Sequence, residues 1–372
     1  MTSTRLFWLR PPADSQSREV DPIGMSSLHE AAANVLLPNI SGRTREASDY
    51  LWTLIGLREG GEDGSSRGRT DAEIWQSFAC FEKALKMYWY ESRCQPRFDG
   101  IKAVRWQDDH GREDLDFQLL SNQRSQGLLG AYVRSLREAG LVESRSLRLS
   151  APGKTLVSSV NLRWGGKLTR QWRGKFEWAT HELTSPAGRE MKAALGQKLF
   201  CPQEMCGAAH AIRVLGAAPK WPAAACHLRD PAKQALAKVG TNLLKLLKAS
   251  TRSFWAMLQT PDAKVLPLPT APLRQTDWLR AIYDSPATVD HWREFLATAG
   301  RSPAAARDAL VALHDRTWQD RGHDGQPWIS FRNGRLWVRP DIRFKSPSPV
   351  AGWDLRWSVC DRLIRQTHWR PS

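Results

Sequence analysis

Apolar residues recur at intervals of three and four along much of the chain, the spacing that buries one face of an α-helix. This spacing predicts helices over 44–59, 71–93, 122–139, 233–258, 277–283, 289–299, 303–320 and 355–367. A short alanine-rich helix is expected from Ser27, where Glu30 stands at capping-box spacing, to Leu36, where Pro38 follows. The chain is therefore expected to be mainly helical.

Strand patterns are few and short. Residues 328–332 and 335–339 alternate between apolar and polar side chains, and Asn333-Gly334 joins them. This dipeptide between two alternating runs is the strongest short signal for a β-hairpin. Further short strands are expected at 141–142 and 146–149. The predicted fold class is mainly α with small β elements, in several domains, the last of them an α+β unit.

Shifts in composition suggest how the chain divides. Its 372 residues allow two or three domains. We expect a helical region over 1–95, a helix followed by short strands over 96–160, and a basic and aromatic region over 161–260. Prolines 261, 267, 269 and 272 mark 261–275 as a linker, and the α+β unit fills 276–372.

The charge balance points to an anionic partner. Lys and Arg number 54 and Asp and Glu 38, which leaves a formal charge of +16. Of the basic residues 39 are Arg, whose planar fork suits phosphate, although a GC-rich genome also favours Arg codons. The sequence has no apolar run of about 18 residues and no secretory signal pattern. We therefore expect a cytoplasmic protein that binds a polyanion and no membrane.

The segment from Leu128 to Leu141, followed by Leu147-Arg148-Leu149-Ser150-Ala151-Pro152-Gly153, resembles the recognition helix and wing of winged-helix proteins of the MarR and PadR kind. The resemblance covers residues 122–160 and implies a winged helix-turn-helix that binds duplex DNA. In this arrangement the start of the helix would reach base edges, its later arginines would meet phosphate, and the wing would add charge. The residues in these three roles are Asn122, Gln123 and Arg124; Arg134 and Arg137; and Arg145 and Arg148.

Basic and aromatic residues interleave most densely between 162 and 178. This combination supplies phosphate contacts and stacking platforms for bases, in single-stranded DNA or RNA as well as in duplex DNA. The residues expected to extend the DNA-binding surface are Arg163, Lys167, Arg170, Arg173 and Lys175. The alternative is a hairpin whose charges are only solvated.

The predicted helix over 233–258 carries a basic stripe opposite its apolar positions. The stripe comprises Lys238, Lys245, Lys248 and Arg252. Such a helix can follow DNA phosphates, lie on an anionic membrane, or simply expose a solvated face over a core.

Two constellations suggest metal chemistry. Cys201, Cys206, His210 and Cys226 have residue types that bind a structural zinc, although Cys-x-x-Cys is absent and small thiols are often buried as apolar groups. Glu190 and Lys192 form the acid-x-Lys half of a restriction-type nuclease site. Gly153-Lys154-Thr155 is not a P-loop, because Arg148 stands where the first glycine is needed.

One further resemblance concerns the first 160 residues. The order Leu36-Leu37-Pro38-Asn39-Ile40-Ser41-Gly42-Arg43-Thr44-Arg45, then Tyr50 and Trp52, then the helix of Phe78 to Tyr90, resembles poorly characterised bacterial proteins of anti-phage defence loci. It implies a subunit that handles nucleic acid together with other proteins. The resulting hypothesis is a non-catalytic DNA-binding subunit of a defence or mobile-element complex. The alternatives are a metal-dependent nuclease and a protein-binding scaffold.

Overall fold

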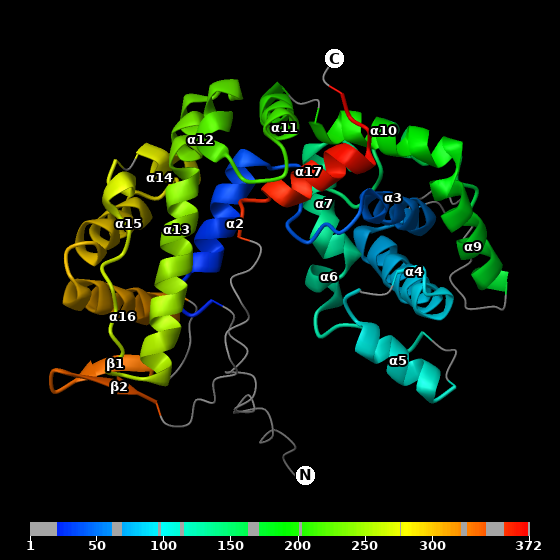
Figure 1. The fold of residues 1–372 in the computed structure, drawn as a ribbon. Coiled ribbons are helices and arrows are strands. Elements are labelled where there is room, and N and C mark those ends of the chain that lie inside the picture. The colour runs from blue at the N-terminus through cyan, green and yellow to red at the C-terminus, as the bar shows by residue number, and fades with distance from the viewer. Residues whose placement is uncertain are drawn as a thin grey trace, which may run out of the picture. The chain divides into compact units, whose positions relative to one another are not determined.

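The computed structural model describes residues 21–61, 69–95, 98–111, 115–162, 171–200, 203–275, 277–320, 326–339 and 353–370. In these ranges the fold is mainly helical and contains one two-stranded antiparallel sheet, which confirms the predicted class at this level (Figure 1). None of the described helices combines the length and the apolar content that a bilayer crossing requires.

The chain forms two compact units, and each is built from segments far apart in sequence. The first unit contains the described residues of Met1–Leu36 and Ala218–Leu355, and the second those of Leu37–Ala217 and Arg356–Ser372. The first 95 residues, expected as one helical region, are thus shared between the units. Residues 261–275, expected as a linker, connect two helices of the first unit.

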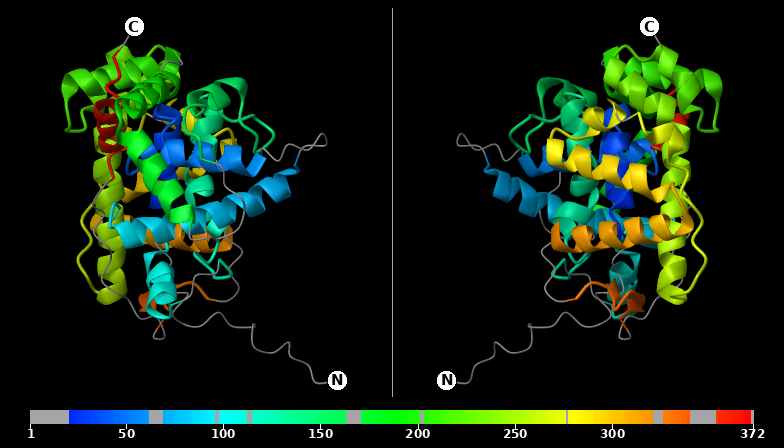
Figure 2. Two further views of the ribbon diagram at one scale, coloured as in Figure 1. Left: turned by 90° about the vertical axis from the view of Figure 1, so that its right-hand side faces the viewer. Right: turned by 90° about the vertical axis from the view of Figure 1, so that its left-hand side faces the viewer.

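The first unit is arranged around one long helix. Its elements are α2 (Met25–Leu36), α12 (Trp221–Ala224), the 3-10 turn η2 (Ala225–His227), α13 (Pro231–Gln259), the 3-10 turn η3 (Ala271–Leu273), α14 (Asp277–Ile282), α15 (Pro286–Ala299), α16 (Pro303–Asp320), β1 (Ile329–Arg332) and β2 (Arg335–Val338). The Asp230 carboxylate accepts a hydrogen bond from Ala232 N, and Pro231 occupies the first turn, so α13 starts with two strong helix signals. Helices α2, α12 and α14 pack on α13 (Figures 1 and 2).

A buried histidine joins three parts of the first unit. The nitrogen Nδ1 of His314 lies 2.7 Å from the carbonyl oxygen of Pro22, and Nε2 lies 3.0 Å from the backbone nitrogen of Trp328. His314 is fully buried, and Phe254 packs against its ring. Since a backbone N–H can only donate, Nε2 accepts, and the proton of the neutral ring is on Nδ1.

The predicted hairpin is confirmed. Strands β1 and β2 pair antiparallel with Ile329 opposite Val338 and Arg332 opposite Arg335. Asn333 and Gly334 both have positive φ, 50° and 73°, as a two-residue hairpin turn of this kind requires.

The regular elements described in the second unit are all helices. The unit comprises α3 (Ala47–Gly61), α4 (Asp71–Ser92), α5 (Ile101–Asp109), α6 (Gln123–Gln126), α7 (Leu128–Glu138), α8 (Ala151–Leu156), α9 (Gln171–Thr184), α10 (Pro186–Phe200), α11 (Gln203–Leu215) and α17 (Trp357–Gln366). Its core is aromatic: the ring of Phe176 from α9 contacts those of Trp52, Phe81 and Tyr88 from α3 and α4. This packing fixes the helices that carry the site described below.

The segment that resembles a winged helix departs from expectation in two places. The single helix expected over 122–139 is broken at Gly127 into α6 and α7. The strands expected at 141–142 and 146–149 are reduced to one bridge, between Val142 and Leu149. Ser150 to Gly153, expected in the wing, instead begin α8, where the Ser150 side chain accepts a hydrogen bond from Gly153 N.

Candidate nucleic-acid interface

Two hollows of the second unit share part of their lining and form one groove. Arg43, Arg45, Asp99 and Gln126 line both hollows, and Arg362 lines the wider one. We call this surface the arginine groove and define it by these five residues. Three of the five are arginines, so the groove has an excess of positive charge.

A hydrogen-bonded loop positions two of the arginines. Residues 37–46 connect α2 to α3 through turns closed by Ile40 N to Leu37 O and Thr44 N to Ser41 O. The hydroxyl oxygen of Tyr50 accepts hydrogen bonds from Ser41 N and Thr44 Oγ1, each at 3.1 Å. Because Tyr50 is fully buried, the loop is tied directly to the core of the unit.

A buried guanidinium supports the same loop. Arg356 is only 6% exposed, and its Nη1 donates to the carbonyl oxygens of Leu37 and Ile40. Burying a charge is costly unless hydrogen bonds compensate it. Arg356 is therefore part of the structure beneath the groove, whereas Arg362, six positions later in α17, opens to solvent.

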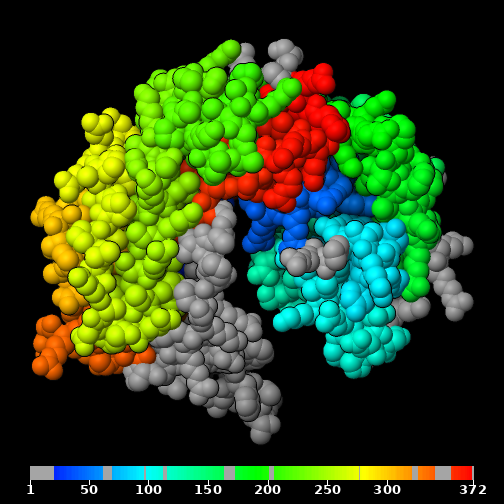
Figure 3. All heavy atoms as spheres, viewed as in Figure 1, coloured from blue at the N-terminus to red at the C-terminus, as the bar shows by residue number. Residues whose placement is uncertain are grey.

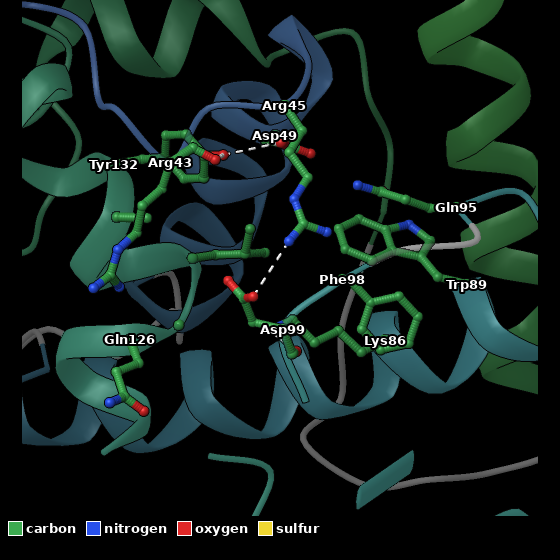
Figure 4. Close-up of a pocket in the computed structure, with 13 residues that line it drawn as sticks. Arg43, Arg45, Asp49, Lys86, Trp89, Gln95, Phe98, Asp99, Gln126 and Tyr132 are labelled. Atoms are coloured by element: carbon green, nitrogen blue, oxygen red, sulfur yellow. Dashed lines mark hydrogen bonds and ion pairs between the residues drawn. The ribbon is translucent and has the colours of Figure 1, made fainter. Parts of the chain in front are cut away.

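Arg43 and Arg362 are oriented by hydrogen bonds but keep donors for a ligand. Arg43 Nη1 donates to Ser125 O at 3.1 Å, and Arg362 Nη1 donates to Arg45 O at 2.9 Å. Arg45 Nη2 lies 3.3 Å from Asp99 Oδ1, with the Arg45 side chain 41% exposed (Figure 4). A guanidinium has five N–H donors. The single bonds of Arg43 and Arg362 thus fix each side chain and leave most of its donors available.

An acid lies buried beneath the groove. Asp49 Oδ2 accepts hydrogen bonds from the Tyr132 hydroxyl at 2.9 Å and from Glu46 N at 3.2 Å (Figure 4). Oδ1 is buried and has no hydrogen-bond partner among the described residues. Burial raises the pKa of the Asp49 carboxyl, and the hydrogen bonds oppose this only in part. Burial, and next the charge of Asp49, raise the pKa of Tyr132 well above its usual range.

A second buried network holds α6 and α7 against α4. Glu82 Oε1 accepts from Lys86 Nζ and from Leu128 N, both at 2.8 Å, and Oε2 accepts from Gln123 Nε2 at 3.0 Å. Lys86 Nζ also donates to Asp99 O at 2.9 Å. The Glu82 carboxylate thus accepts from the first N–H of α7, at the break in the predicted helix.

The residues expected to contact base edges differ in their exposure and hydrogen bonding. Asn122 is exposed, and its side chain accepts from Ser125 N as the cap of α6. Gln123 is committed to Ala79 O and Glu82 Oε2. Arg124 is exposed and makes no hydrogen bond or ion pair with any described residue.

Of the later arginines of the segment, two are exposed and two donate to backbone carbonyls. Arg134 and Arg145 are exposed, with no polar partner among the described residues. Arg137 donates to the carbonyls of Glu143 and Ser146, and Arg148 donates to that of Arg69. Arg137 therefore holds the turn after α7, and Arg148 ties this segment to the residues before α4.

The basic and aromatic segment lies partly outside the described residues. Arg163, Lys167 and Arg170 lie in the undescribed range 163–170. Arg173 in α9 pairs with Glu91, its Nε 2.9 Å from Oε2, and lies over the ring of Trp172. Lys175 is exposed on the same helix.

The expected zinc ligands do not come together among the described residues. Cys206 and His210 are one turn apart on α11 of the second unit, whereas Cys226 belongs to the first unit and its thiol donates to Ala223 O. Cys201 lies outside the described ranges. Across those ranges no three His, Cys, Asp or Glu side chains are grouped so that they could hold a metal ion.

The expected nuclease pair also has no shared site. Glu190 and Lys192 lie two positions apart in α10, a spacing at which side chains do not face each other. Glu190 is exposed, and burial lowers the pKa of Lys192 while the charge of Glu46 opposes the shift.

Sequence patterns alone did not identify the groove. Gly42-Arg43-Thr44-Arg45 was part of a resemblance, without a role for its arginines, and Arg362 was one basic residue of a predicted terminal helix. Comparison with protein-family models, with curated proteins and with solved structures finds no match to the chain.

Proposed function

We propose that the protein binds nucleic acid, duplex DNA in the first place, mainly through phosphate contacts in the arginine groove. The observation that carries this proposal is the convergence of three arginines from distant parts of the chain. Arg43 and Arg45 come from the loop before α3, and Arg362 comes from α17. Among the described lining residues Asp99 is the carboxylate at the rim, while Asp49 is buried beneath it.

The chemistry of the groove suits the phosphates of a polymer. Arginine donates two parallel hydrogen bonds to phosphate oxygens, and charge-assisted bonds are stronger than neutral ones. The net charge of +16 adds a long-range attraction for a polyanion. Gln126 at the groove and exposed Arg124 on the same short helix could extend contacts beyond the phosphates.

We propose further that the protein acts without catalysis as one subunit of a larger complex. The sequence resemblance to proteins of anti-phage defence loci motivates the proposal of a non-catalytic subunit. The orientation of Glu190 and Lys192, which do not face each other on α10, also motivates it. Arg124, Arg134 and Arg145 remain candidates for DNA contacts, because their side chains are exposed.

The test is a fluorescence-anisotropy titration at several salt concentrations with duplex DNA, single-stranded DNA and structured RNA. The triple variant Arg43→Gln, Arg45→Gln, Arg362→Gln is compared with wild type. The control variant removes three exposed cations of the same unit that do not line the groove, Lys154→Gln, Arg189→Gln and Lys198→Gln. Removing the cation that meets one phosphate lowers the slope of log affinity against log salt by about 1.

We expect the groove variant to lower this slope by about 3 and the control to change it by less than about 1. Equal effects of the two variants would contradict a groove-centred interface. A gel of the recovered strands after incubation with Mg²⁺ tests the second part, since cut strands would contradict a non-catalytic role.

A further inference from the structure

The first unit carries a second basic surface, on the long helix α13. Lys238, Lys245, Lys248 and Arg252 are all exposed, and we call this set the α13 stripe. At about 100° per residue the four side chains fall within an arc of about 80°, so they share one face. They extend over 14 positions, or about 21 Å at 1.5 Å per residue. In Figure 3 the yellow-green atoms of α13 lie on the face toward the viewer.

The opposite face of α13 is occupied by the core of the first unit. Leu236, Leu243, Leu247 and Phe254 are completely buried. A helix that lies on a membrane inserts its apolar face between the lipids. Because α13 has no apolar face to offer, the stripe is better suited to a soluble polyanion.

The charges of the stripe are not balanced within the helix. Residues 231–259 contain no Asp or Glu. Lys245 and Lys248, and Lys248 and Arg252, are neighbours at spacings of three and four, at which like charges destabilise a helix. None of the four stripe residues makes an ion pair with a described residue, whereas Arg293 on α15 and Arg316 on α16 pair with acids of their own helices.

From this arrangement we infer that the α13 stripe is a second nucleic-acid-binding surface, which follows the phosphate backbone of one strand. A strand of duplex DNA presents a phosphate about every 3.4 Å of rise along the axis, and since the strand winds around that axis, a straight helix about 21 Å long can follow part of these phosphates. Four cations along this length can neutralise several of them. The inference rests on the proposed function only in that it takes the same polymer as ligand, since groove and stripe belong to different units.

The experiment measures the salt dependence of duplex binding for three variants of the full chain. The stripe variant carries Lys238→Gln, Lys245→Gln, Lys248→Gln and Arg252→Gln. The matched control removes four cations from other parts of the same unit, as Arg280→Gln, Arg293→Gln, Arg301→Gln and Arg316→Gln. The groove variant is the triple substitution above, and circular dichroism verifies that each variant is folded.

We expect the stripe variant to lower the salt slope by about 3 to 4, and the control to lower it by less than about 1. A normal slope for the stripe variant with a reduced slope for the groove variant would overturn the inference and leave the proposed function standing. The reverse pattern would support the stripe and contradict the groove. Absence of binding by wild type would overturn both.

A footprint on the wild-type protein gives a second readout that needs no substitution. Acetylation of Lys238, Lys245 and Lys248 is measured by mass spectrometry with and without duplex DNA, with Lys264 of the same unit as internal reference. Protection of the three lysines relative to Lys264 supports the inference, and equal modification overturns it. Stripe-dependent sedimentation with anionic lipid vesicles, without protection by DNA, would overturn it in favour of a membrane surface.

Discussion

The hydroxyl of Tyr132 on α7 donates a hydrogen bond of 2.9 Å to Asp49 Oδ2 on α3. Both side chains are almost completely buried, and the second oxygen of Asp49 has no hydrogen-bond partner among the described residues. A buried carboxylate that is only partly satisfied opposes folding when it is ionised. Because the ionisation of Asp49 depends on pH, this buried pair links the stability of the second unit to pH.

The first prediction concerns the substitution Asp49→Asn. Burial raises the pKa of Asp49 in the folded state above the value of about 3.9 of an exposed Asp. Between these two pKa values the folded protein holds a proton that the unfolded chain releases. The contribution of Asp49 to the free energy of unfolding therefore falls as pH rises through this window, and it stays low above it.

An amide at position 49 cannot titrate, and its oxygen can still accept from Tyr132. We expect the difference in the free energy of unfolding, variant minus wild type, to grow as pH rises from acid toward neutral and then to level off. Urea denaturation at a series of pH values measures it. A difference that stays constant across the acidic range would contradict the assignment.

The second prediction concerns the buried pair of Glu82 and Lys86, whose side chains are 0% and 3% exposed. Glu82→Ala leaves the Lys86 ammonium buried with Asp99 O as its one remaining partner among the described residues, and it removes the acceptor of Leu128 N. We expect a loss of about 3–5 kcal/mol in the free energy of unfolding, measured by urea denaturation.

The control for this prediction is Arg173→Ala in the same unit. It breaks the ion pair with Glu91, in which the Arg173 side chain is 55% exposed. Exposed pairs contribute about 0–1 kcal/mol. Similar losses for the two substitutions would show that the Glu82 network does not hold α7 against α4.

Local sequence signals predicted some of the elements of this fold. The Asn333-Gly334 turn and the amphipathic spacing of α13 each depend on residues near in sequence, and both elements are present. The residues that cap or interrupt a helix depend on specific hydrogen bonds. Thr70 caps α4 through a capping box with Glu73. The chain breaks at Gly127 because the Glu82 carboxylate, 46 positions away, accepts from the first N–H of α7.

Local sequence signals could not predict which helices pack together within a unit or which residues line the groove. Helix α2 packs on α13, which begins about 200 positions later, and Arg362 donates to the carbonyl of Arg45, 317 positions away. Such pairings depend on tertiary packing and leave no periodic trace in one sequence. The unusual density of arginine predicted an anionic partner, but not which three arginines would converge.

The third prediction concerns Gly153 in α8. A Cβ atom at this position would lie 2.0 Å from the carbonyl oxygen of Leu141. Since that neighbour is backbone, it cannot move aside as a flexible side chain would. We expect Gly153→Ala to lower the free energy of unfolding by about 1–3 kcal/mol in a urea titration.

Gly174 in the exposed part of α9 is the matched control. A Cβ atom there meets no atom within 4 Å. Alanine is favoured over glycine within a helix by about 1 kcal/mol, so Gly174→Ala should stabilise the protein. If Gly153→Ala also stabilised it, the close packing of α8 against Leu141 would be wrong.

The last prediction separates two arginines of α7 that the resemblance to winged helices treats alike. Arg137 donates from Nε to Glu143 O at 3.2 Å and from Nη2 to Ser146 O at 3.0 Å, so it closes the turn after the helix. Arg134, one turn earlier, is exposed without a polar partner among the described residues.

Arg137→Ala should lower the free energy of unfolding by about 1–2 kcal/mol and leave the salt slope of DNA binding unchanged. Arg134→Ala should change stability by less than about 0.5 kcal/mol and, where Arg134 meets a phosphate, lower the slope by about 1. Thermal denaturation and anisotropy titrations measure the two effects separately. A lower slope for Arg137→Ala at unchanged stability would show that this side chain leaves its turn to bind DNA, as a recognition helix would require.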